Sequence, residues 1–83
     1  MEKNLRAELS GELFSLAATE LSESPENCLK AAQIAYKLGM PKYATKLTWD
    51  GLYAVTVHPN ADIEAELMGL MLALRFWGLP VNT

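Results

Sequence analysis

The chain has 83 residues, which is enough for one domain with one hydrophobic core. Hydrophobic residues make up 51% of it and charged residues 20%, a balance that excludes a disordered tail or a charge-rich linker. The formal net charge of −3 argues against nonspecific binding to nucleic acid or to an anionic membrane. We therefore expect one folded domain over residues 1–83.

Several simple features bear on compartment and cofactors. The single Cys excludes an internal disulfide, and the single His leaves no metal site of ordinary type. The N-terminus lacks a basic region followed by an apolar block, so no signal peptide is expected. The longest dense apolar run, residues 67–74, falls far short of the roughly 20 residues that cross a bilayer. These features predict a cytoplasmic protein without metal, cofactor or membrane span.

Two helices are expected in the first half of the chain. Leucines recur every three to five positions and predict a helix over residues 3–21, with Leu5, Leu9, Leu13, Leu16 and Leu21 on one face. A second helix begins after Ser24, a good N-cap, at Pro25, whose missing N–H costs nothing there. Lys37 followed by Gly39 predicts its end.

The second half predicts two more helices and an all-α fold. Pro41 can start a third helix directly after that Gly, so the second and third helices should form a tight antiparallel hairpin. We expect the third helix to end near Val55, because residues 55–57 are β-branched and Pro59 follows; a short strand there is the alternative. With Asn60 as N-cap, the fourth helix runs over residues 61–77.

The fourth helix is too apolar for a surface helix. Residues 67–77 carry one charge, so no face of that cylinder is polar, and a helix that is apolar all round is normally buried all round. One interpretation makes it the central core helix. The other, which we favour because so short a chain buries little surface, makes part of it a face for another protein or a second copy. The candidate partner-binding residues are Leu67, Met68, Leu70, Met71, Leu74, Phe76 and Trp77.

Positive charge collects on the central hairpin. Residues 28–50 hold four Lys and one Asp, whereas the flanking parts of the chain are acidic. This basic side is either a solvated face that complements the acidic first helix or a site for an acidic partner. Its residues are Lys30, Lys37, Lys42 and Lys46.

The sequence offers little for catalysis. Cys28 lies in the first turn of the second helix, but no His is placed beside it by spacing, so we expect a buried small residue. His58 beside Pro59 is interpreted as a loop residue, and the pair Asp62 and Glu66 as partners of the helix dipole rather than cation ligands. No phosphate loop, CxxC or metal-spaced His pair is present, and we expect no enzyme.

The stretch Ile34 to Asp50 resembles a helix-turn-helix DNA reader through Ile34-Ala35 and Leu38-Gly39-Met40. That likeness implies that the third helix enters the major groove. It departs from the pattern because Thr45, Leu47, Trp49 and Asp50 occupy the base-reading stretch, which contains no Arg.

The same hairpin resembles a tetratricopeptide repeat, with Ala32, Gly39, Ala44 and Gly51 at its small positions. It departs at Pro41 and Thr48, where large aromatics are usual. In size, Ala-rich hairpin and apolar last helix, the chain is similar to the small tetratricopeptide-like chaperones of needle subunits in type III secretion systems. That resemblance implies a chaperone that buries a partner's amphipathic helix. A DNA-binding regulator and a small inhibitor or antitoxin are the alternatives.

Overall fold

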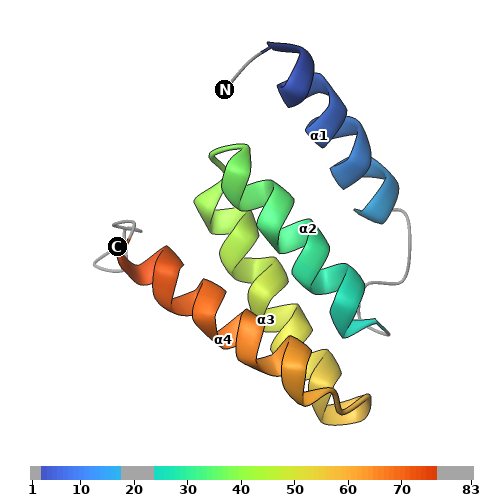
Figure 1. Cartoon of the computed structure of the whole chain (residues 1–83), viewed down its shortest axis with the longest axis vertical. Helices are drawn as coiled ribbons and strands as arrows, with labels where there is room; N and C mark the ends of the chain where they lie inside the picture. Colours follow the sequence, from blue (N-terminus) through green and yellow to red (C-terminus); the bar gives the residue numbers. More distant parts are fainter. Residues whose placement is uncertain (1–2, 18–23, 77–83) are drawn as a thin grey trace.

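The computed structural model describes residues 3–17 and 24–76 and confirms the all-α fold (Figure 1). Within these ranges every regular element is a helix, and no strand occurs. The elements in chain order are α1 (Lys3–Ala17), α2 (Pro25–Lys37), α3 (Pro41–Val57) and α4 (Ala61–Phe76). The predicted residues 18–21 of the first helix and Trp77 of the fourth lie outside the described residues.

The predicted start of α2 and the turn after it are confirmed. Ser24 Oγ accepts a hydrogen bond from the backbone N–H of Asn27 at 3.2 Å, and Pro25 is the first helical residue. After α2, Gly39 adopts a φ of 76°, a left-handed conformation that suits glycine. Pro41 then begins α3 at once, so α2 and α3 form a hairpin with a short turn.

The expected end of the third helix near Val55 was two residues too early. The helix continues to Val57, and the backbone N–H of His58 still donates to the carbonyl of Ala54 at 2.8 Å. Tertiary contact outweighs the weak helix propensity of the β-branched stretch, since Val55 is buried against its neighbours. The strand alternative for residues 55–57 is therefore wrong.

Figure 1 shows how the four helices are arranged. α2 and α3 lie side by side and make the most extensive helix–helix contact. α4 packs against α3 and, to a lesser degree, α2, whereas α1 lies mainly along α2. The chain therefore has a three-helix centre of α2, α3 and α4, with α1 added on one side.

Two clusters of buried side chains form the core. The larger one joins all four helices and contains Leu13, Ala31, Ala32, Ile34, Ala35, Leu38, Ala44, Leu47 and Leu74. The smaller one lies between α2, α3 and α4 and contains Leu29, Val55 and Leu67. Much of the hairpin contact is made by alanines, which bring helix backbones close together. The buried Thr48 hydroxyl is satisfied because it donates to the Ala44 carbonyl at 2.7 Å.

α1 is the least buried helix. Of its residues only Leu13 is buried, while Leu5 is 47% exposed. A polar contact ties its first turns to the hairpin, because Arg6 Nη1 donates to the backbone carbonyl of Leu38 at 3.3 Å. The leucine stripe predicted for this helix thus packs on the core through the buried Leu13 and the partly buried Leu9 and Leu16.

Candidate functional site

The structure divides the predicted partner-binding residues of α4 into two groups. Leu67 and Leu74 are fully buried within the chain, so assigning them to a partner face was wrong. They lie seven positions apart on one side of α4, which is the side that faces α2 and α3. Their place is the core, and they hold α4 onto the hairpin.

The other residues of that set lie toward the surface. Met68 is 55% exposed and Phe76 is 88% exposed. Leu70 and Met71 are half-buried, and Leu70 also contacts both core clusters. Trp77 lies outside the described residues. Part of the α4 surface is therefore both apolar and in contact with solvent, as an interaction face requires.

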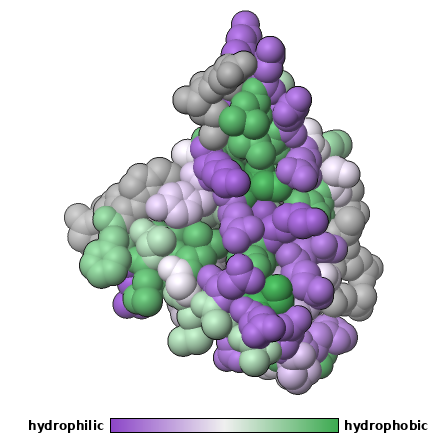
Figure 2. Space-filling view, viewed as in Figure 1, coloured by the Kyte–Doolittle hydropathy of each residue, from purple (hydrophilic) through white to green (hydrophobic). Residues whose placement is uncertain are grey.

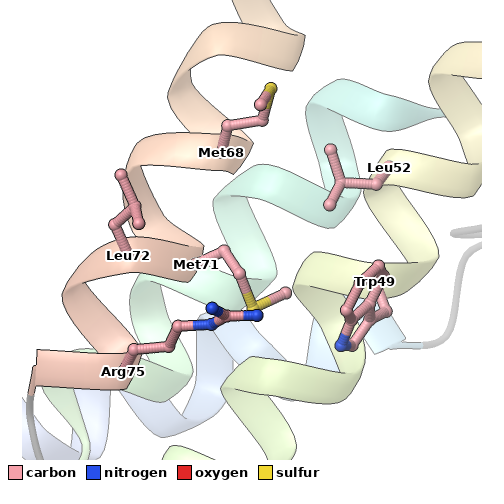
Figure 3. A pocket seen from close by; sticks show the side chains of 6 residues that line it. All are labelled: Trp49, Leu52, Met68, Met71, Leu72 and Arg75. Atoms are coloured by element: carbon pink, nitrogen blue, oxygen red, sulfur yellow. The ribbon is translucent and has the colours of Figure 1, made fainter.

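An apolar groove of about 390 Å³ runs between α3 and α4 (Figure 3). α4 contributes one wall and α3 the other. In Figure 3 the Met71 and Arg75 side chains extend from α4 toward Trp49, and Leu52 lies one turn further along α3. The groove residues are Trp49, Leu52, Met68, Met71, Leu72 and Arg75.

The groove is apolar except at one end. Leu72 is 54% and Trp49 57% exposed, so large apolar side chains meet water along both walls. Arg75 is the charged residue among those that line the groove, and it too is exposed. In Figure 2 hydrophobic side chains gather toward α4, a second hydrophobic strip lies at the top of the view, where α1 lies, and hydrophilic side chains cover much of the rest. The site is suited to burying apolar side chains and to one ionic contact.

The groove contains four residues that the sequence did not predict as partner-binding, namely Trp49, Leu52, Leu72 and Arg75. A signal existed for the first two. They are three positions apart on α3; Leu52 is partly buried against the core, whereas Trp49 lies on the side away from the buried Ala44 and Leu47, where an exposed Trp is unusual. Trp49 thus gives this side of α3 a large apolar side chain in contact with solvent.

Comparisons with protein-family models, with curated proteins and with solved structures all give no match. The chain's own geometry is therefore the basis for any functional conclusion.

The four lysines of the predicted basic side are all exposed. Lys46 forms an ion pair with Asp50 one turn later, with Nζ and Oδ2 2.9 Å apart. The hydrogen bond to Asp50 and its negative charge raise the pKa of Lys46. This pair lies largely in solvent and compensates one of the four positive charges of the basic side.

Of the residues considered for catalysis, one is buried and three are exposed. Cys28 is fully buried, as expected. Burial and the negative charge of Asp50 raise the pKa of its thiol to about 11, although the positive charge of Lys46 acts in the opposite direction. The thiol therefore stays protonated at neutral pH and is not an activated nucleophile. His58, Asp62 and Glu66 are exposed. No group of three or more metal-ligating side chains occurs within residues 3–17 and 24–76.

Two further hollows lie elsewhere on the surface. One, of about 280 Å³, separates α1 from the turn between α2 and α3, and the exposed Phe14 borders it together with Met40 and Tyr43. The other is bordered by Gln33, Tyr36 and Lys37 of α2. Among the helices that the structure describes, none has the length and hydrophobicity to cross a membrane.

Proposed function

We propose that this chain is a small protein-binding module, acting as a chaperone, that buries the apolar face of a partner's amphipathic helix in the groove between α3 and α4. The observation that carries the proposal is the groove itself. Two adjacent helices expose Trp49, Leu72 and Met68 to solvent along a shared depression. A helix laid in such a groove would remove these side chains from water.

The composition of the groove also fits a helical partner. Methionine side chains adapt to differently shaped apolar surfaces, and Trp supplies a large contact area at low cost in conformational entropy. The groove lies where another antiparallel helix would continue the α2, α3, α4 order, in contact with both α3 and α4. A partner helix would thus complete a layer of helices that the chain begins.

The resemblance to needle-subunit chaperones supports one particular partner to try first. Buried Ala32, Ala44 and Gly51 occupy the small positions of that pattern, and the apolar α4 follows the hairpin. A helix from a type III secretion needle subunit is therefore the first natural candidate, and a cytoplasmic setting follows from the same proposal.

The experiment is a titration with a synthetic amphipathic helical peptide, followed by the fluorescence of Trp49 in a Trp77→Phe background. Binding should shift the Trp49 emission to shorter wavelength as the indole leaves water. Leu72→Glu should weaken binding by on the order of tenfold or more, since it places a charge in an apolar contact. The matched control is Gln33→Glu on α2, at an exposed position outside the groove. A peptide that binds equally well to Leu72→Glu would refute the proposal.

A further inference from the structure

The charges along α4 have a regular order that bears on what fills the groove. Glu64 and Arg75 are eleven positions apart, so they lie on nearly the same side of the helix, about 16 Å from each other along its axis. Met68 and Met71 lie between them on the same stripe, at steps of four, three and four. Both charged side chains are exposed. Met68, Met71 and Arg75 of this stripe line the groove, and the stripe continues beyond them to Glu64, so it runs from an acidic end through an apolar middle to a basic end.

The two charged residues have no ionic partner within the part of the chain that the structure describes. The ion pair found there is Lys46 with Asp50, on α3. No hydrogen bond of the Glu64 carboxylate or the Arg75 guanidinium to another described side chain occurs either. Both ends of the stripe are thus available to a complementary surface.

The complement that this order requires is present in the chain itself. A helix that complements this stripe in antiparallel orientation must place an acidic side chain beside Arg75 and a basic side chain beside Glu64, with apolar side chains between them. A second α4 meets all three requirements, because reversing its direction places its Arg75 beside the first Glu64 and its Glu64 beside the first Arg75. A two-fold axis perpendicular to the helix also produces antiparallel alignment of the same element, and two-fold dimers are the commonest oligomers.

We propose that the groove is a self-complementary interface, and that two copies of the chain associate through a two-fold axis passing between Met68 and Met71 of the paired α4 helices. Each α4 lies in the groove of the other copy, where it covers Trp49 and Leu52 of the opposite α3. The two α3 and two α4 helices then form a four-helix arrangement around the apolar residues of both grooves. Leu72 and the methionines become the centre of the interface, and the ion pairs close its two ends.

This proposal rests on the proposed function in one respect: the same groove serves both. A partner helix and a second copy therefore compete, and the dimer is the form that keeps the groove out of water until a partner arrives. Binding of a helical peptide should convert dimer to monomer, with an apparent affinity that falls as the protein concentration rises.

The test is sedimentation equilibrium of the full chain over a concentration series, with charge reversals at both ends of the interface. The wild type should show a monomer–dimer equilibrium. Arg75→Glu and Glu64→Lys each bring like charges together twice in the symmetric dimer, so each should raise the dissociation constant by roughly tenfold at low salt. Combining them restores opposite charges and should return the constant close to the wild-type value. Lys30→Glu, which makes the same charge change as Arg75→Glu at an exposed position on α2, should leave it unchanged.

A second measurement reports the register. In the proposed dimer Met68 of one copy lies opposite Met71 of the other, so a mixture of the Met68→Cys and Met71→Cys variants should form inter-chain disulfides faster than either variant alone. A wild type that stays monomeric at every concentration overturns the proposal. The proposal is also overturned if the single charge reversals leave the dissociation constant unchanged, or if the double variant dimerises no better than the single ones. Faster disulfide formation by either cysteine variant alone than by the mixture overturns it as well.

These outcomes separate the dimer from the proposed function. A monomer whose Trp49 responds to the helical peptide refutes the dimer and retains the binding module. A dimer that follows the charge reversals but ignores the peptide retains the interface and refutes the binding module. Circular dichroism of each variant checks that helix content is unchanged, which is expected because both charged side chains are exposed.

Discussion

Gly51 of α3 lies directly beneath Leu67 of α4. A Cβ atom at position 51 would lie 2.8 Å from Cδ2 of Leu67 and 3.1 Å from Cβ of Cys28 on α2. This is where the three central helices meet, and the absence of a side chain on Gly51 sets how closely α4 approaches the hairpin. The position of α4, and therefore the shape of the groove, depends on this contact.

Gly51→Ala should destabilise the protein although Ala favours a helix. Overpacking costs about 1–3 kcal/mol, and the gain in helix propensity is about 1 kcal/mol, so a net loss of up to about 2 kcal/mol is expected. Urea denaturation measures the change in the free energy of unfolding. The loss should shrink in a Leu67→Ala background, because the clashing methyl groups are then absent.

Gly69 on α4 provides the matched control for that substitution. It is exposed, and a Cβ there would meet nothing within 4 Å. Gly69→Ala should therefore raise the free energy of unfolding by up to about 1 kcal/mol through helix propensity alone. Equal effects of the two glycine substitutions would show that the close approach at Gly51 does not limit packing.

The second prediction separates the core side of α4 from its groove side. Leu74→Ala removes a fully buried side chain and should cost about 2–5 kcal/mol of unfolding free energy. Met68→Ala, at an exposed position, should change it by less than about 1 kcal/mol when measured at a protein concentration below that of self-association. Met68→Ala should nevertheless weaken peptide binding. A large stability loss at Met68 would place it in the core instead.

The sequence predicted the elements of the fold through local chemistry. Ser24 and Pro25 predict the start of α2, and Gly39 before Pro41 predicts the turn, because helix capping and backbone restriction depend on only a few neighbouring residues. The end of α3 was misplaced because the local signal at residues 55–57 opposes the helix, while burial of Val55 favours it. Tertiary contact is not visible in a window of a few residues.

The sequence did not predict which side of α4 faces the core, for a different reason. Its residues are apolar on nearly every side, so the periodicity that normally points to the core is weak. The absence of a side chain on Gly51 lets Leu67 pack against α3, and this sets which side of α4 faces inward. Predicting it requires knowing that two residues sixteen positions apart are in contact. The same long-range contact brings Trp49 and Leu52 next to Met68 and Met71. The sequence therefore predicted an apolar surface on α4 but not the α3 residues that form the other wall of the groove.

The third prediction concerns pH. The pKa of Cys28 is raised to about 11 in the folded chain from an ordinary value of 9.0, so the folded state holds this proton more tightly than the unfolded state. Its contribution to stability is fully present below pH 9 and is lost as pH rises toward 11, by at most about 2–3 kcal/mol. The control is Cys28→Ala, which lacks the thiol. The difference in unfolding free energy between the two proteins should narrow over this range, and a constant difference would contradict the shift.

The fourth prediction concerns α1. This helix contributes only Leu13 to the buried core among its described residues and contacts mainly α2. It should therefore open at lower free energy than the hairpin, so its backbone amides should exchange with deuterium faster than those of the middle of α2 and α3. Exchange measured by mass spectrometry on peptic fragments tests this. Equal protection of α1 and α2 would show that the four helices unfold as one unit.

The last prediction addresses the DNA-binding alternative. In a helix-turn-helix reader, α3 would enter the major groove, and Lys42 and Lys46 would contact phosphates. In the structure Lys46 is paired with Asp50, Trp49 points toward the apolar groove, and the chain carries a net charge of −3. We therefore expect titration onto duplex DNA at low salt to give only weak binding, unchanged by Lys42→Glu and Lys46→Glu. Fluorescence anisotropy of labelled DNA measures it. A drop in affinity in the Lys42→Glu variant, with a shallower salt dependence, would favour the regulator over the binding module, because a protein that neutralises one phosphate fewer releases about one counterion fewer on binding.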